Sequence, residues 1–218
     1  MTMAQNLGRF CSAMVVMVAV AGCVEIEKPV LELSAPVIQK SATDQSQLQV
    51  AVLPVTDLRK DPGAILIDSY VPGSSSGGSG GFGVSSASEH SEIDVGKPDL
   101  AIWVGDAFAA ALENRFHAER AATLESAAAP IVLKVAIRDA AVFGWMKGSG
   151  SGYCRDARIM LRVQIYQRGA LAQTRNYSGD VQECPARGGT SATLAGAMSD
   201  LIARSFPDLD ATISRLKA

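Results

Sequence analysis

Cysteine is the residue type in this chain whose spacing carries the clearest chemistry. Four cysteines, Cys11, Cys23, Cys154 and Cys184, occur among 218 residues. A thiol can accept a lipid, form a disulfide with a second thiol or bind a metal, and its sequence context distinguishes these roles. Cys11 and Cys23 lie in or next to an apolar N-terminal stretch, whereas the other two lie in the C-terminal third. We therefore expect the two pairs to serve different purposes.

The residues before Cys23 are typical of a secretory signal. Arg9 is the only charged residue before position 25, and an apolar stretch runs from Phe10 to Ala21. This stretch is shorter than the about 20 residues of a membrane-spanning helix and has the length of a signal peptide's apolar region. The run Val20-Ala21-Gly22-Cys23 resembles the lipobox of bacterial lipoproteins. We predict that residues 1–22 are a signal peptide, and that Cys23 is lipidated with fatty chains such as palmitate.

Lipid on Cys23 would attach the protein to a membrane. Several acyl chains on one residue give stable anchoring, whereas a single chain binds only marginally. The next residue is Val24 and not Asp, which in lipoproteins of this type favours the outer membrane. Residues 24 to about 45 mix prolines, serines and charges without a period, as tethers do. We expect a periplasm-facing outer-membrane protein whose residues 23–45 form a lipid-anchored tether.

Cys154 and Cys184 form an even pair in an oxidising compartment once the signal is removed. The residue numbers of two positions that pair across a β-hairpin always add to the same sum. The mean of 154 and 184 is 169, and Gly169 belongs to the predicted turn Arg168-Gly169. The two cysteines then face each other at the open end of the hairpin. A two-residue loop misses this register by one, and either a three-residue loop or one bulge corrects it. We predict a disulfide worth roughly 3–4 kcal/mol.

The sequence does not show the arrangements of residues that catalysis or metal binding usually requires. The two histidines, His90 and His117, are expected in a loop and at a helix end, which gives too few metal ligands and no base placed on a nucleophile. Residues 78–83 match G-x-G-x-x-G, but they lie inside a Gly/Ser run. The sequence leaves open a pair of carboxylates for glycoside hydrolysis, because acidic residues are frequent in the predicted turns. We expect a protein that is not an enzyme and has no cofactor, catalytic residue or metal site.

Composition limits the partners and the number of domains. Removing Arg9 with the signal leaves 19 basic and 22 acidic side chains, a net charge of −3. This balance provides no basic surface for nucleic acid. The hydrophobic fraction of 48% and the chain length fit one folded domain. We place this domain at residues 46–218, with a flexible Gly/Ser-rich loop at residues 73–88.

Hydrophobic periodicity predicts the elements that would position these residues. Alternation of apolar and polar side chains indicates strands, and an apolar stripe at helical spacing indicates helices. Because strict alternation implies one buried and one solvated face, we expect an α+β fold, with a mostly antiparallel sheet of about four strands and two helices packed on one face. The expected strands are 47–55, 131–138, 158–165 and 171–181, with 64–71 left open as an additional short strand. The expected helices are 98–117 and 190–206, the second broken by Pro207-Asp208.

Two pairs of side chains are candidates for contact with a partner. Asp57 and Arg59 follow the first predicted strand and form either a structural turn or ion pair, or a partner contact. Trp145 and Tyr153 flank a short loop, where aromatic residues either cover the end of the core or form a binding edge. The polar face of the predicted sheet is a further candidate surface.

Several short motifs together resemble the YajG-like family of bacterial lipoproteins. They are the lipobox, the Asp57-Leu58-Arg59 run after the first strand, a central helix, Pro130–Val135 at the start of a three-strand meander, and Asn176-Tyr177-Ser178-Gly179 before the last helix. The resemblance covers about residues 15–206 and implies an outer-membrane lipoprotein of unassigned biochemical role. This chain departs from the family in its Gly/Ser loop and in its C-terminal cysteine pair.

These observations favour a lipid-anchored, non-enzymatic accessory or structural component of an outer-membrane assembly or transport system, which binds an envelope protein. The alternative is a lipoprotein that binds a ligand such as a lipid, a glycan or peptidoglycan. An exposed apolar patch would favour the first function, and a deep apolar pocket would favour the second. A third class, an envelope hydrolase, would require clustered carboxylates with perturbed pKa values.

Overall fold

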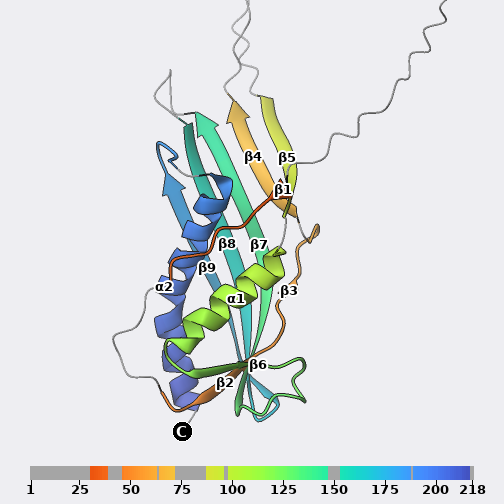
Figure 1. Cartoon of the computed structure of the whole chain (residues 1–218), viewed down its shortest axis with the longest axis vertical. Helices are drawn as coiled ribbons and strands as arrows, with labels where there is room; N and C mark the ends of the chain where they lie inside the picture. The colour runs from red at the N-terminus through yellow and green to blue at the C-terminus, as the bar shows by residue number, and fades with distance from the viewer. Residues whose placement is uncertain are drawn as a thin grey trace, which may run out of the picture.

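The computed structural model describes residues 30–38, 46–62, 64–71, 87–95, 98–146, 153–187 and 189–216. Within these residues, one β-sheet carries two helices on one of its faces (Figure 1). The strands are β1 (Val30–Leu31), β2 (Gln49–Val52), β3 (Thr56–Asp57), β4 (Ala64–Val71), β5 (Ala87–Val95), β6 (His117–Arg120), β7 (Ile131–Met146), β8 (Tyr153–Gln167) and β9 (Ala170–Glu183). The helices are α1 (Leu100–Glu113) and α2 (Thr190–Leu216).

Strand β7 is the centre of the sheet because it pairs along both of its edges. On one edge, β8 runs antiparallel to β7, and β9 runs antiparallel to β8. On the other edge, β2, β3 and β4 follow one another along β7, all parallel to it. Strand β6 lies outside β2, β5 lies outside β4, and β1 lies outside β5. One long strand therefore holds both halves of the sheet together.

The predicted sheet of about four mostly antiparallel strands is wrong. The described residues form a mixed sheet of nine strands, six of them on the path β1-β5-β4-β7-β2-β6. The chain between β2 and β7 includes α1, and a long connection of this kind can return the chain in the same direction. Alternation shows which face of a strand is buried but not the direction of its neighbour. The class is α+β, with both helices on one face (Figure 1).

Four of the described strands, β1, β3, β5 and β6, lie where the sequence predicted none. Strand β5 begins at Ala87, within the predicted loop 73–88, and residues 72–86 lie outside the described residues. Its sequence ASEHSEIDV is mostly polar and lacks the apolar alternation that indicates a strand. The predicted helix 98–117 ends at Glu113. His90 therefore lies on a strand rather than in a loop, and His117 begins β6 rather than ending a helix.

Local capping explains where α1 begins. The side chain of Asp99 accepts a hydrogen bond from the backbone N–H of Ile102 at 2.8 Å, which satisfies one of the free donors of the first turn. The buried side chains of the helix then recur at helical spacing and face the sheet. They are Leu100, Trp103, Val104, Ala107, Phe108, Ala109, Ala111 and Leu112.

Helix α2 continues through Pro207 to Leu216, so the predicted break there is wrong. Proline cannot donate to the carbonyl four residues earlier, which here is Ala203, and an interior proline costs about 3 kcal/mol. Beyond the proline, Leu209 and Ile213 are fully buried against the core. Burying two such side chains contributes about 3–6 kcal/mol, which offsets the cost of the proline.

The β8–β9 hairpin has the predicted register. Arg168 and Gly169 form a two-residue turn. Their φ values are 50° and 81°, and positive φ values of this kind favour glycine. The register shifts by one residue between Ile165 and Tyr166, after which the pairs keep a constant index sum out to Arg155 and Glu183. Of the two corrections that the sequence left open, the structure has the bulge.

The core lies between the sheet and the helices. Alternate residues of β8, Ile159, Leu161, Val163 and Ile165, are fully buried on the helix side. Gly179 of β9 allows the closest approach, because a Cβ atom there would meet the Ala197 carbonyl oxygen and lie 2.5 Å from the Leu201 nitrogen. In the described part of the chain, neither helix combines the length and apolar character needed to cross a membrane.

Candidate functional site

Cys23, the predicted lipidation site, lies outside the described residues. The description begins at Val30, which together with Leu31 pairs parallel with β5. Residues 32–38 then run from β1 across the helix-bearing side of the sheet to α2 (Figure 1). We call residues 30–38 the arm. This part of the expected tether is in contact with the domain, and Leu31, Leu33 and Ile38 pack against its core.

Hydrogen bonds fix the arm on both helices. The Trp103 indole Nε1–H of α1 donates to the Ser34 carbonyl oxygen at 2.8 Å. The backbone N–H of Val37 donates to the Ser199 hydroxyl of α2 at 2.9 Å. The Ser34 N–H donates to the hydroxyl of Ser191, also on α2. The chain that follows the predicted lipid site is thereby held across the helix layer.

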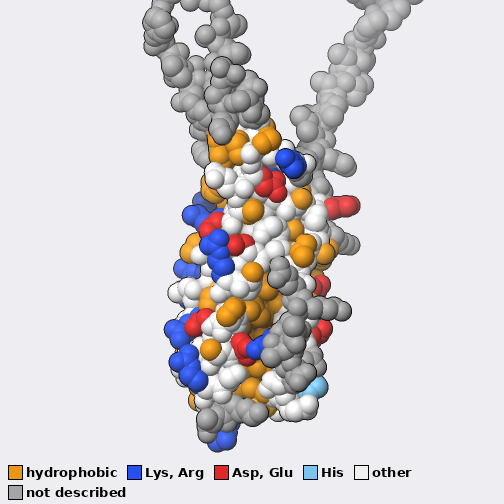
Figure 2. Space-filling model, turned by 90° about the vertical axis from the view of Figure 1, so that its left-hand side faces the viewer, with side chains coloured by type: hydrophobic (Ala, Val, Ile, Leu, Met, Phe, Trp, Pro, Cys, Tyr) orange, Lys and Arg blue, Asp and Glu red, His pale blue; other side chains and the backbone are white. Residues whose placement is uncertain are grey.

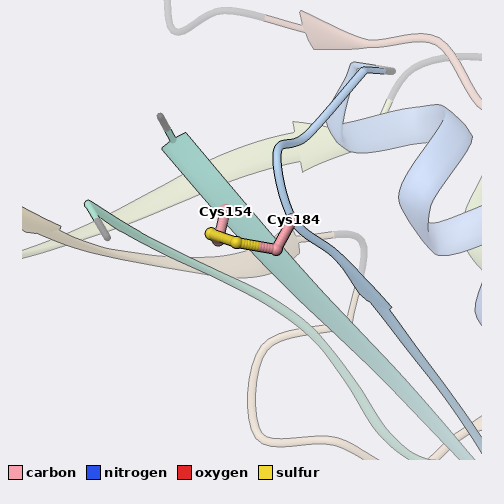
Figure 3. The surroundings of a disulfide bond; sticks show 2 residues. All are labelled: Cys154 and Cys184. Carbon is pink, nitrogen blue, oxygen red and sulfur yellow. A yellow bond between two sulfur atoms is a disulfide. The ribbon is translucent and has the colours of Figure 1, made fainter. Parts of the chain in front are cut away.

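The structure joins Cys154 to Cys184 in a disulfide (Figure 3). The two Cα atoms are 4.4 Å apart, Cys154 is fully buried, and Cys184 follows the end of β9. The bond closes the open end of the hairpin, next to the last strand pair, Arg155 and Glu183. A buried thiol in this position has a structural role rather than that of a reactive cysteine.

Asp57 and Arg59 form an ion pair that is nearly buried. The Arg59 Nη2 atom lies 2.6 Å from Asp57 Oδ2, and its Nε donates to Asp57 Oδ1 at 2.9 Å. The two side chains are only 10% and 8% exposed. Arg59 Nη1 also donates to the Ala140 carbonyl oxygen at 3.4 Å, beside the bulge in β7. Of the alternatives left open by the sequence, the structure shows the structural ion pair.

Trp145 and Tyr153 do not form one binding edge. Trp145 lies opposite Cys154 in the β7–β8 pairing, and Tyr153 is the neighbour of Cys154 along β8. Because successive strand residues point to opposite faces, the two aromatic side chains lie on opposite faces of the sheet. Tyr153 packs against Gly144, and the Arg155 guanidinium lies 5.0 Å from its ring centroid.

The polar face of the sheet is partly covered and partly paired. At one end, Tyr166 packs with Val132 and with residues of the 121–127 segment in a second small apolar cluster. Further along, Arg158 Nη2 lies 2.6 Å from Asp139 Oδ2. Burial raises the pKa of the Asp156 carboxyl, which lies on this face. The described residues contain no cluster of three or more histidine, cysteine or acidic side chains that could hold a metal ion.

A cleft of about 470 Å³ lies between α1, α2 and the arm. We call it the helix cleft. Its apolar lining comes from all three segments: Val37 and Ile38 of the arm, Ala111 of α1, and Ile202, Ala203, Phe206 and Pro207 of α2. Figure 2 faces the side on which α2 lies and shows hydrophobic side chains gathered along the middle of this face, between charged ones. The cleft has the size and lining of a small-molecule site.

Polar groups lie at both ends of the helix cleft. Asn114, Arg115 and Asp210 line one end, where the Arg115 Nε donates to Asp210 Oδ2 at 3.1 Å. Ser199 lies at the other end, and its hydroxyl donates to the Ala195 carbonyl oxygen. Between these ends, Pro207 deprives the Ala203 carbonyl of its helical donor. The arrangement offers apolar contact along its length and hydrogen bonding at its ends.

The predicted helix 190–206, with an apolar stripe packed on the sheet, includes the cleft residues Ile202 and Phe206. The sequence does not reveal the helix cleft because one wall is formed by the arm, which is distant in sequence and has no periodic pattern. The unusual local signal was Pro207, an interior helix breaker next to apolar residues. A proline at this position indicates a helix end equally well, so the cleft becomes visible only in the folded structure.

The chain has distant likenesses among solved structures. No family model and no curated protein matches the sequence. Protein XCC0632 from Xanthomonas campestris, of family DUF330, is 15% identical, with 83% of this chain and 91% of that chain covered and a TM-score of 0.47. Hypothetical protein CT253 from Chlamydia trachomatis is 10% identical, with 77% and 96% covered and a TM-score of 0.43. PelC from Paraburkholderia phytofirmans, solved as a dodecamer, is 12% identical, with 78% and 92% covered and a TM-score of 0.36. Likenesses this distant do not indicate a function.

Proposed function

We propose that this chain is a lipid-anchored protein of the bacterial envelope that works without catalysis, by binding an apolar ligand in the helix cleft. The observation that carries the proposal is the cleft itself. Its volume of about 470 Å³ lies within the 300–1,000 Å³ typical of ligand pockets. Its walls are mainly aliphatic and aromatic, with polar groups at the ends. A pocket of this kind favours the ligand-binding class over a purely structural protein.

The sequence around Cys23 supports the location. The lipobox-like run predicts lipid on this cysteine, and Val24 favours the outer membrane. Only six residues lie between Cys23 and Val30, so the seven residue steps place the anchor at most about 25 Å from the start of the arm. A protein held this closely would meet its ligand at the membrane surface. The likeness to YajG-like lipoproteins stays a prediction, and it is consistent with this location.

Photo-cross-linking in intact cells tests the proposal. Ala203 and Ala211 are both exposed on α2, but only Ala203 lines the cleft. A photoreactive phenylalanine analogue at position 203 should form an adduct of small mass, and the same analogue at position 211 should not. With Cys23→Ala, the chain should lose its acyl mass and its membrane attachment. Equal labelling at both positions, or none, would contradict ligand binding in the cleft.

An accessory role in envelope assembly or transport through protein contacts is a second candidate. It is favoured by Ile102, which is 53% exposed on α1 beside a hollow lined by Leu53, Pro54 and Val55. Cross-linking in cells, followed by capture through a C-terminal tag, would test it with Ile102→Asp. The matched control is Leu171→Asp, because Leu171 is 52% exposed at the hairpin. Loss of one stoichiometric envelope partner only with Ile102→Asp would support this role, and no such loss would exclude this surface.

A further inference from the structure

We infer that the occupant of the helix cleft is a single fatty acyl chain, whose polar head lies at the end formed by Asn114, Arg115 and Asp210. The inference deepens the proposed function by naming the ligand class, and it rests on that function. It is carried by the shape of the cleft, by the order of its apolar and polar residues, and by the composition of the chain beside it.

The cleft is long and narrow relative to its volume. Its α2 wall extends from Ser199 to Asp210, about 16 Å along the helix axis. One turn of α-helix with its side chains is about 10–12 Å wide and 5.4 Å high, and so fills roughly 400–600 Å³. Spread over about 16 Å, a volume of about 470 Å³ leaves a mean cross-section of roughly 30 Å², well below the roughly 80–110 Å² of a helix 10–12 Å wide. The dimensions suit a thin chain and do not suit a partner helix.

The side chains in the middle of the cleft favour an apolar ligand, although the Ala203 carbonyl there lacks its helical donor. Ile202, Ala203, Phe206 and Pro207 follow one another along the α2 wall, and Ala111 faces them from α1. An amide or sugar hydroxyl placed there without a partner would cost about 1–3 kcal/mol for each lost hydrogen bond. A glycan or an extended peptide carries such groups at every unit. A hydrocarbon chain carries none, and gains about 0.8 kcal/mol for each methylene that it buries.

The polar end identifies where the head group lies. Asn114 is the C-cap of α1, and its side chain can both donate and accept hydrogen bonds. The Arg115–Asp210 ion pair presents both charges next to it, with side chains 29% and 23% exposed. At the opposite end, the Ser199 hydroxyl already donates to Ala195 and accepts from Val37. The Asn114 end is therefore the better site for a head group that exchanges hydrogen bonds.

The chain's own neighbouring segment is a poor occupant. Residues 39–45, which follow Ile38, have the sequence QKSATDQ. Six of these seven side chains are polar or charged, and burying them against Ile202 and Phe206 would leave their hydrogen-bonding groups without water. The apolar wall thus favours an external apolar chain over this segment.

Binding of cis-parinaric acid, a fluorescent fatty acid, tests the inference. The protein is the full mature chain with Cys23→Ala, which avoids detergent that would compete for the cleft. We expect saturable binding that palmitate displaces. Ala203→Trp should weaken binding at least tenfold by filling the cleft, and the matched Ala211→Trp should change it less than twofold. Ala203→Phe, a smaller addition, should give an intermediate loss and guards against a folding defect in the tryptophan variant.

Stearic acids that carry a nitroxide near the head or near the tail test the orientation. The head label should broaden the backbone amide signal of Asn114 more than that of Ser199, and the tail label should do the reverse. The opposite pattern would overturn the orientation. Absence of parinaric acid binding, or equal binding by both tryptophan variants, would overturn the acyl-chain inference. If position 203 still gives a small adduct in cells, the proposed function stands and only the ligand class is wrong.

Discussion

Reduction of the Cys154–Cys184 disulfide should destabilise the domain by an amount that the loop length sets. The bond closes a loop with a sequence separation of 30 residues. On the chain-entropy model, a loop of this length restricts the unfolded chain by about 12 cal/mol/K, or about 3.7 kcal/mol at 25 °C. For a domain of this size, 1 kcal/mol corresponds to about 2–4 °C, so the melting temperature should fall by about 7–15 °C.

Denaturant unfolding of the oxidised and reduced wild-type protein measures this difference without changing any other atom. The double variant Cys154→Ala, Cys184→Ala should unfold close to the reduced protein, and a reducing agent should not change its stability further. Because Cys154 is fully buried, the variant also loses its sulfur contacts and should be slightly less stable than the reduced chain.

The result that would refute this reasoning is equal stability of the oxidised and reduced protein, within about 1 kcal/mol. That outcome would mean that the unfolded chain already keeps the β8–β9 hairpin closed, so that the bond removes little freedom. Hydrogen exchange near Arg155 and Glu183 would then show the same protection in both states. With the expected entropy effect, reduction should increase exchange first at this open end of the hairpin.

Three further changes have defined outcomes. Gly179→Ala should destabilise the fold by about 1–3 kcal/mol, measured by denaturant unfolding, because its Cβ meets the α2 backbone, whereas Gly189→Ala has open space and should cost little. Asp57→Ala should cost about 3–5 kcal/mol by breaking a nearly buried ion pair, and Asp106→Ala, which breaks an exposed one, should cost less than about 1 kcal/mol; equal costs would contradict the role of burial. Burial raises the pKa of Asp156 above its ordinary value, so the folded state holds this proton to higher pH than the unfolded state, and the stability that this group contributes should decline as pH rises through the raised pKa. Asp156→Asn should remove that part of the pH profile, and an unchanged profile would show that the carboxylate is well solvated.

Local sequence features predicted the hairpin that carries the disulfide. The alternation of β8 and β9, the Arg168-Gly169 turn and the positions of the two cysteines are all contained in about 30 consecutive residues. Pairing across a hairpin depends only on the turn and on any bulge, so index arithmetic was sufficient to place the cysteines together. Helix α1 was similarly accessible through its cap at Asp99 and its apolar stripe.

The pairing of strands that are far apart in the chain could not be predicted from local sequence features. Strands β2 and β3 are short, and the parallel pairing of β2, β3 and β4 with β7 joins residues about 75–80 positions apart. No local pattern encodes which edge they occupy. The continuation of α2 past Pro207 depends on the burial of Leu209 and Ile213, which outweighs the local signal for a helix end.

For the candidate site too, local sequence identified individual residues, and their roles depended on long-range structure. Asp57 and Arg59 were identified from the sequence, but the choice between a structural pair and a partner contact needed their burial. Trp145 and Tyr153 were grouped by their positions around a loop, and the strand parity separates them. The helix cleft needed the arm in place, and no sequence motif marks it.

The arm also determines how a mechanical load would enter the domain. If Cys23 is fixed in a membrane, tension on the protein passes through Val30 and Leu31, whose pairing with β5 spans only two residues. Next in line are the hydrogen bonds of Ser34 with Trp103 and Ser191, and then the hydrogen bond of Val37 with Ser199. Val37 is part of the cleft wall. The long ladders of β7, β8 and β9 lie outside this path. A pull on the anchor would therefore strain the wall of the helix cleft well before it could shear these long ladders.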